Sequence, residues 1–111
     1  MARFNRKSTA EQVSEGIDLT GRNALVTGSN TGIGMETARV LALRGAHVTM
    51  ACRNLDKAAL ARRSILDAAG GRINESQLDL LELDLNSLAK TRQAAQEFNS
   101  RGLPLHLLVN N

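Results

Sequence analysis

Apolar and polar positions along the chain follow two periods, one typical of strands and one typical of helices. Residues 23–28 (NALVTG) form a short apolar run that ends in glycine, which predicts a buried strand. The stretch that follows predicts a helix that begins at Gly32 and ends near Gly45. Its expected core-facing side comprises Ile33, Thr37, Ala38 and Leu41.

The same sequence of strand and helix then repeats. Residues 46–52 (AHVTMAC) are rich in β-branched and apolar side chains, and the run is too short for a helix, so we expect a second strand. Residues 54–71 (NLDKAALARRSILDAAGG) predict a second helix, with Asn54 as its N-cap and Gly70-Gly71 as its end.

A third strand, a third helix and a fourth strand complete the pattern. They are expected at 77–85 (QLDLLELDL), at 86–102 (NSLAKTRQAAQEFNSRG) and at 105–109 (LHLLV). Strands that alternate with helices of crossover length predict a parallel sheet. The fold class is therefore α/β, with the element order β-α-β-α-β-α-β. We expect a Rossmann-like parallel sheet with helices on both faces, of which these are the first four strands.

Composition and charge restrict the function classes. The 111 residues are 42% hydrophobic and 23% charged, as in one ordinary globular domain. We expect residues 1–20 to form an arm or short helix and residues 21–111 the domain itself. The net charge is +3, and the chain has two Phe, no Trp and no Tyr. Without aromatic stacking platforms beside the basic residues, we exclude a nucleic-acid-binding protein.

Cysteine content and apolar run length indicate the compartment. Cys52 is the single cysteine, so no internal disulfide can form and a reducing compartment is expected. No apolar run approaches the roughly 18 residues of a transmembrane helix, and the first residues lack a secretory signal. We expect a cytoplasmic protein, although the basic, acid-free start (MARFNRKSTA) leaves a plastid location open.

Three glycines mark the turn between the first strand and the first helix. Gly28, Gly32 and Gly34 lie in the stretch TGSNTGIG, where a Rossmann-like fold brings its backbone against a nucleotide. Without a Cβ the chain can turn tightly and approach a diphosphate, and free N–H groups at the helix start attract the anion. The glycine spacing differs from the G-x-G-x-x-G of the standard dinucleotide fingerprint, and no Lys follows the last glycine as it does in a phosphate loop. The alternative interpretation is that the three glycines simply make a flexible turn.

The end of the second strand bears on the choice of cofactor. An acid there would accept hydrogen bonds from a ribose 2′-hydroxyl, but the sequence has Cys52 followed by Arg53. A guanidinium suits a 2′-phosphate, so NADP(H) is preferred over NAD(H), and a methyltransferase, which would want an acid there, is disfavoured. The alternative is that Arg53 is a solvated surface charge.

Three motifs together resemble the short-chain dehydrogenase/reductase family. TGSNTGIG is similar to the T-G-x-x-x-G-I-G cofactor motif, LDL at 83–85 to the acidic segment that contacts adenine, and LVNN to the start of N-N-A-G. The stretches STAEQVSEGIDLTGR and ALRGAHVTMACRN most resemble the retinol-dehydrogenase-like and plastid-import-associated branch. The resemblance implies a cofactor-binding set of Gly28, Ser29, Asn30, Thr31, Gly32, Ile33, Gly34, Arg53, Asn54, Asp84, Leu85 and Asn110.

The resemblance also implies a reaction whose residues are missing here. The family transfers hydride with a Tyr-x-x-x-Lys pair, and the chain has no Tyr to act as general acid/base. His47, His106 and Cys52 have no catalytic partner nearby in sequence and are interpreted as structural. We therefore expect an amino-terminal, NADP(H)-binding portion of an oxidoreductase that acts on alcohol or carbonyl groups, with its small-molecule substrate bound by a missing second half.

Two alternatives belong to other classes. The chain could act as a nucleotide-binding or regulatory module without catalysis, or be an inactive fragment that binds nothing. The sequence also leaves open a homo-oligomer, because a fourth strand at the sheet edge invites pairing with another chain.

Overall fold

Strands and helices alternate along residues 14–29, 32–102 and 104–109, the part of the chain that the computed structural model describes. The elements in chain order are β1 (Asn23–Thr27), α2 (Gly32–Leu43), β2 (His47–Cys52), α3 (Leu55–Ala69), the 3₁₀ turn η1 (Glu75–Gln77), β3 (Leu78–Glu82), α4 (Leu88–Ser100) and β4 (Leu107–Val109). This order confirms the predicted α/β class.

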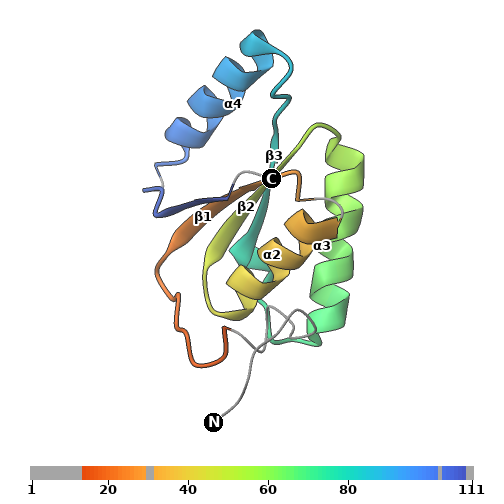
Figure 1. Ribbon diagram of the computed structural model, residues 1–111, viewed down its shortest axis with the longest axis vertical. Helices are drawn as coiled ribbons and strands as arrows, with labels where there is room; N and C mark the ends of the chain where they lie inside the picture. The colour runs from red at the N-terminus through yellow and green to blue at the C-terminus, as the bar shows by residue number, and fades with distance from the viewer. Residues whose placement is uncertain (1–13, 30–31, 103, 110–111) are drawn as a thin grey trace.

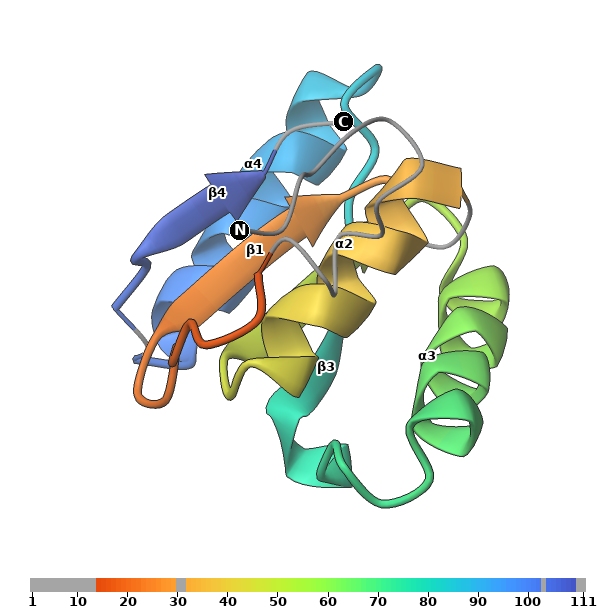
Figure 2. The same cartoon turned by 60° about the horizontal axis from the view of Figure 1, so that its bottom comes forward.

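The four strands form one parallel sheet in the order β3-β2-β1-β4. The chain steps from β1 to β2 to β3 in one direction and then returns past both strands to place β4 on the other side of β1. Right-handed crossovers in opposite directions put their helices on opposite faces. Accordingly, α2 and α3 cover one face and α4 lies on the other (Figures 1 and 2).

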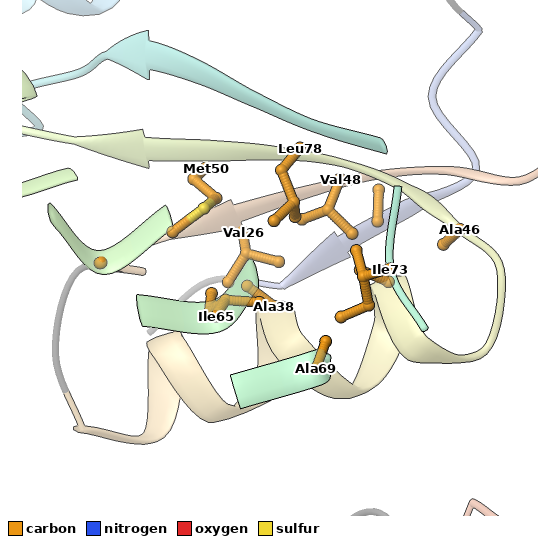
Figure 3. Close-up of a cluster of buried hydrophobic side chains, with 12 residues drawn as sticks. Val26, Ala38, Ala46, Val48, Met50, Ile65, Ala69, Ile73 and Leu78 are labelled. Atoms are coloured by element: carbon orange, nitrogen blue, oxygen red, sulfur yellow. The ribbon is translucent and has the colours of Figure 1, made fainter. Parts of the chain in front are cut away.

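The main core lies between the sheet and the α2/α3 layer (Figure 3). Alternate strand residues point into it, because side chains of a strand alternate between the two faces. From the strands come Ala24, Val26, Val48, Met50 and Leu78, each with at most 1% of its surface exposed. From the helices come Ala38, Ala42, Ala61, Ile65 and Ala69.

The opposite face carries a smaller core and an apolar groove. Ala51 and Leu81 of the sheet pack against Ala94 and Phe98 of α4. Beside this cluster, a groove of about 310 Å³ runs between the sheet and α4, and its lining includes Leu25, Leu81, Leu83, Leu105 and Leu108. Leu108, on edge strand β4, is 61% exposed, so the described residues leave part of this face open.

Local signals fix the ends of the helices. The Asn54 side chain accepts a hydrogen bond from Lys57 N at 3.1 Å and caps α3, and Gly70 ends that helix with a left-handed φ of 58°. At the end of α2, Gly45 N donates to Ala42 O at 3.0 Å, and a later part of the chain adds two further bonds. Gln77 Nε2, in η1, donates to Ala42 O at 2.8 Å and to Ala46 O at 3.0 Å.

The described part of the segment before β1, where an arm or short helix is expected, forms turns. Residues 14–21 contain two turns and no helix, and residues 1–13 lie outside the described residues. Thr20 N and Thr20 Oγ1 donate to Asp18 Oδ1 at 2.9 and 2.6 Å. These bonds, led by the one from the hydroxyl, lower the pKa of Asp18. Thr20 lies so close to Gly45 that a Cβ there would stand 2.7 Å from Thr20 Oγ1.

The predicted core-facing side of α2 was partly wrong. Ala38 is fully buried as expected, but Ile33 is 80% exposed and the buried helix positions also include Gly34, Val40 and Ala42. Small residues at 34, 38 and 42 recur every four positions, so they form the row that faces the sheet. Among the described residues, no helix is both long enough and apolar enough to cross a membrane.

Candidate functional site

The site lies where the strand order reverses, at the carboxyl ends of β1 and β4. In open α/β sheets this position forms a crevice that binds ligands. Thr27, the last residue of β1, donates from its hydroxyl to Val109 O of β4 at 3.4 Å. Gly28 follows at once, with its N–H donating to Ala51 O at 3.0 Å. The chain therefore leaves β1 in a turn that is tied to both neighbouring strands.

The turn uses glycine at two positions with positive φ. Gly28 has φ 59° and Gly32 has φ 55°, a left-handed conformation that other residues rarely adopt. A Cβ built on Gly32 would meet no atom of the described chain within 4 Å, so the backbone there faces open space. Gly34 is buried inside α2, and exposed Ile33 precedes it. Main chain without a Cβ thus borders the crevice, as a close approach to a diphosphate requires.

A buried polar pair connects the glycine turn to the end of β2. Ser29 is fully buried, and its Oγ lies 3.2 Å from Cys52 Sγ at the end of β2. Cys52 itself is 2% exposed, which agrees with a small core residue. Asn30 and Thr31, which were expected to complete this turn, lie outside the described residues.

A cleft of about 420 Å³ opens beside the turn and extends along the carboxyl ends of three strands. Its lining comprises Thr27, Gly28, Ala51, Cys52, Arg53, Asn54, Lys57, Leu83, Leu85 and Asn86. The described lining therefore contains two cations and no carboxylate, so it favours an anionic ligand.

Arg53 and Asn54 lie where β2 passes into α3. Both are exposed and both line the cleft. The Asn54 side-chain oxygen is occupied by the N-cap bond to Lys57 N, so its amide NH₂ is the group left for a ligand. The guanidinium of Arg53 makes no hydrogen bond or ion pair within the described chain. It is therefore available to an anion in the cleft.

The predicted adenine segment is only partly at the cleft. Leu85 lines it and is 59% exposed, but Asp84 is not among the lining residues. Asp84 Oδ1 accepts a hydrogen bond from Asn86 N at 2.9 Å, and Asp84 O accepts one from Thr91 Oγ1 at 3.0 Å. Asp84 thus holds the turn after β3, and Asn86 lies at the cleft. Asn110 lies outside the described residues.

Sequence reasoning missed Lys57 and Asn86. Lys57 lies one helical turn after Arg53, a spacing that could have shown that both side chains reach the same end of α3. Asn86 gave no signal of its own, because its position depends on the turn held by Asp84.

The histidines have structural partners. His47 Nε2 lies 2.9 Å from Asp79 Oδ2, and His106 Nδ1 accepts a hydrogen bond from Asn23 N at 3.0 Å. His106 comes just before β4 and not within it. In the described ranges, the structure brings together no group of His, Cys, Asp and Glu that could hold a metal ion.

Known proteins resemble this chain in both sequence and fold. The family model described as short chain dehydrogenase matches residues 22–111. A WW domain-containing oxidoreductase of Danio rerio is 43% identical over 98% of this chain and 26% of its own length. Retinol dehydrogenase 11 of Mus musculus is 46% identical over 86% of this chain and 29% of its own. A chloroplastic short-chain dehydrogenase, TIC 32 B of Brassica napus, is 39% identical over 97% and 32%.

A solved structure agrees. The RhlG/NADP active-site complex from Pseudomonas aeruginosa superposes with a TM-score of 0.73 at 32% identity, over 86% of this chain and 36% of that one. The chain spans 26–32% of the length of the oxidoreductase, the retinol dehydrogenase and the chloroplastic dehydrogenase that it matches.

Proposed function

The chain belongs to the short-chain dehydrogenase family, and from that membership we propose that it forms the NADP(H)-binding part of an oxidoreductase acting on alcohol or carbonyl groups. The observation that carries the proposal is the position of the glycine turn. It leaves β1 at the strand reversal and opens directly onto a cleft lined by cations. We expect the diphosphate to bind at this turn and the adenosine to bind in the cleft.

The residues present fit such a cofactor. Gly32 leaves open space where a side chain would otherwise stand, which suits main-chain N–H groups donating to phosphate oxygens. Leu83 and Leu85 give the cleft apolar surface that can pack against a base, and Asn86 adds a side-chain amide. When bound, the dinucleotide supplies or accepts the hydride, and the chain's own residues hold and orient it.

Arg53 supports a preference for NADP(H) over NAD(H). A phosphate monoester carries a charge of about −1.5 to −2 at neutral pH and is recognised best by a guanidinium fork. NAD(H) has a ribose hydroxyl at the same place, and an enzyme that selects it presents a carboxylate there. The described residues that line the cleft include no carboxylate.

Titration of the 111-residue chain with NADPH and with NADH, followed by the fluorescence of the reduced nicotinamide, tests the proposal. We expect tighter binding of NADPH. Arg53→Gln should weaken NADPH binding by roughly 10- to 30-fold, because one charge-assisted pair is lost, and change NADH binding by less than about twofold. Equal affinity of the wild-type chain for both dinucleotides would contradict the preference.

We propose a retinol-dehydrogenase-like substrate class for the whole protein on the basis of the 46% identity to retinol dehydrogenase 11. The second candidate, a nucleotide-binding module without catalysis, is favoured by the absence of Tyr from these 111 residues. Incubation of the chain with NADPH and all-trans-retinal should give binding of the cofactor but no oxidation of it. Steady NADPH oxidation that depends on retinal would show that another residue replaces the tyrosine.

A further inference from the structure

We propose that His106 is a proton-sensitive latch, which holds strand β4 firmly on strand β1 only while its imidazole is neutral. The inference concerns the amino end of the sheet and does not depend on the proposed dinucleotide function. It rests on two hydrogen bonds between His106 and one residue of β1, and on the short pairing between β4 and β1 that follows them.

His106 binds both backbone groups of Asn23, the first residue of β1. Its backbone N–H donates to Asn23 O at 2.9 Å, and its Nδ1 accepts a hydrogen bond from Asn23 N at 3.0 Å. Nδ1 accepts only through its lone pair, so the neutral ring has its proton on Nε2. A protonated ring carries a proton on both nitrogens. Protonation therefore removes one of the two bonds and leaves two N–H donors facing each other.

β4 is the most weakly paired strand of the described sheet. Its three residues pair with residues 24–26 of β1, whereas the β1–β2 and β2–β3 pairings each extend over five residues. It lies at the edge of the sheet, and Leu108 at its centre is 61% exposed. The bonds of His106 come directly before the first paired residue, Leu107. Loss of the side-chain bond should therefore open the β1–β4 ladder from that end.

The neighbouring strands offer no group that would compensate for the lost bond. No carboxylate in the described ranges forms an ion pair with His106. On the far side of Asn23 lies His47, its register partner on β2, whose Nε2 is 2.9 Å from Asp79 Oδ2. Arg22, which precedes Asn23, is exposed and adds a positive charge. The acid on this side is thus already paired.

The same holds for the helix that leads to β4. At the end of α4, the Arg101 guanidinium donates to Leu80 O and to Glu97 Oε1, each at 3.0 Å. The carboxylate of Glu97 is therefore also paired. Protonation of His106 adds a third kind of cation near Arg22 and Arg101 without a described anion to balance it.

Release of β4 would change the face that carries the apolar groove. Leu105 and Leu108 line this groove from the β4 side, and Leu25 lines it from β1. At the other end of β4, Val109 O accepts a hydrogen bond from the Thr27 hydroxyl at 3.4 Å. The His106 bonds and this bond thus hold the two ends of β4. Weakening the first in acid would uncover the backbone edge of β1, to which another strand can pair.

Hydrogen exchange of backbone amides in the full 111-residue chain tests the latch. Protection factors, corrected for the intrinsic pH dependence of exchange, are measured from about pH 8 to about pH 5, the range in which histidines change charge. We expect the protection of Asn23 and of residues 107–109 to fall about fivefold, the size of one ordinary hydrogen bond. The protection of residues 48–52 of β2 should stay constant, because the opening is confined to the sheet edge.

Two variants assign the effect to one side chain. His106→Asn places an acceptor oxygen close to the position of Nδ1 and takes up no proton in this pH range, so its protection should stay high throughout. His47→Gln is the matched control. In the wild type, Nε2 of His47 can donate to Asp79 in either charge state, so protonation there breaks no bond. His47→Gln should therefore lose protection in acid as the wild type does.

Three results would overturn the proposal. The first is an unchanged protection of residues 107–109 in the wild type across the pH range. The second is a fall of the same size in His106→Asn, and the third is a fall that extends equally to β2. If His106→Asn does not fold, nitrogen NMR of the wild-type imidazole decides. A proton on Nε2 of His106 at the higher pH is expected, and a proton on Nδ1 would refute the latch.

Discussion

Replacing Gly32 by alanine separates the effect of the glycine turn on folding from its effect on binding. Gly32 has φ 55°, and a Cβ there meets no described atom within 4 Å. The folded chain therefore has room for the methyl group, and the destabilisation comes from the left-handed conformation alone. That conformation costs about 1–2 kcal/mol for an L-residue with a side chain. A domain of this size should lose roughly 4–8 °C of melting temperature per kcal/mol.

Gly70→Ala is the matched control. Gly70 has φ 58°, and a Cβ there also meets nothing within 4 Å, but the residue ends α3 and does not line the cleft. Both variants should therefore lose similar stability in urea unfolding. Only Gly32→Ala should lose dinucleotide affinity, by about 10- to 100-fold, if the methyl group displaces a phosphate from one or two main-chain N–H donors.

Isothermal titration of both variants with NADPH, at a temperature where each is fully folded, measures the difference. A Gly32→Ala chain that is folded and binds NADPH like the wild type would refute the reasoning. So would an equal loss of affinity in Gly70→Ala, because it would trace the loss to stability.

Further predictions concern other parts of the structure. Gly45→Ala should destabilise the fold by about 2–4 kcal/mol in urea unfolding, because its Cβ would stand 2.7 Å from Thr20 Oγ1 at a φ of 104°. The pKa of Asp18 is lowered mainly by the Thr20 hydroxyl, so the Asp18 carboxylate should contribute stability that is lost as the pH falls below the ordinary aspartate pKa of 3.8. Asp18→Asn should reduce this pH dependence of stability in urea unfolding, and an unchanged pH profile in the variant would contradict the prediction. Leu108→Lys should reduce self-association in sedimentation velocity, because it places a charge on the exposed edge strand, and a wild-type chain that stays monomeric would contradict this.

The sequence predicted the strands, the parallel class and the helix ends well because these depend on local signals. Asn54 caps α3 and Gly70 ends it as expected, since a cap needs only the residues beside it. The third strand was predicted too long. It ends at Glu82 because the chain then turns through Asp84, whose carboxylate accepts from Asn86 N. Alternating Leu and acid continue past Glu82, so the pattern alone could not show the turn.

The face of α2 was harder to predict for a physical reason. Hydrophobic periodicity favours the side with the largest apolar residues, and it placed Ile33 in the core. The row that packs closest to the sheet is made of Gly34, Ala38 and Ala42, whose small size allows the close contact. Ile33 lies outside this row and is 80% exposed. The cleft residue Lys57 was missed although its four-residue spacing from Arg53 can be seen in the sequence.

The two hydrogen bonds from Gln77 to Ala42 O and Ala46 O have a consequence for folding during synthesis on the ribosome. Synthesis runs from the N-terminus, so β1, α2 and β2 leave the exit tunnel while Ala42 O and Ala46 O still lack the Gln77 amide that later donates to both. The first βαβ unit can reach its final form only after residue 77 has emerged. Nascent chains that stall before this residue should therefore remain open to chaperones, whereas those that stall well beyond it should already resist proteases.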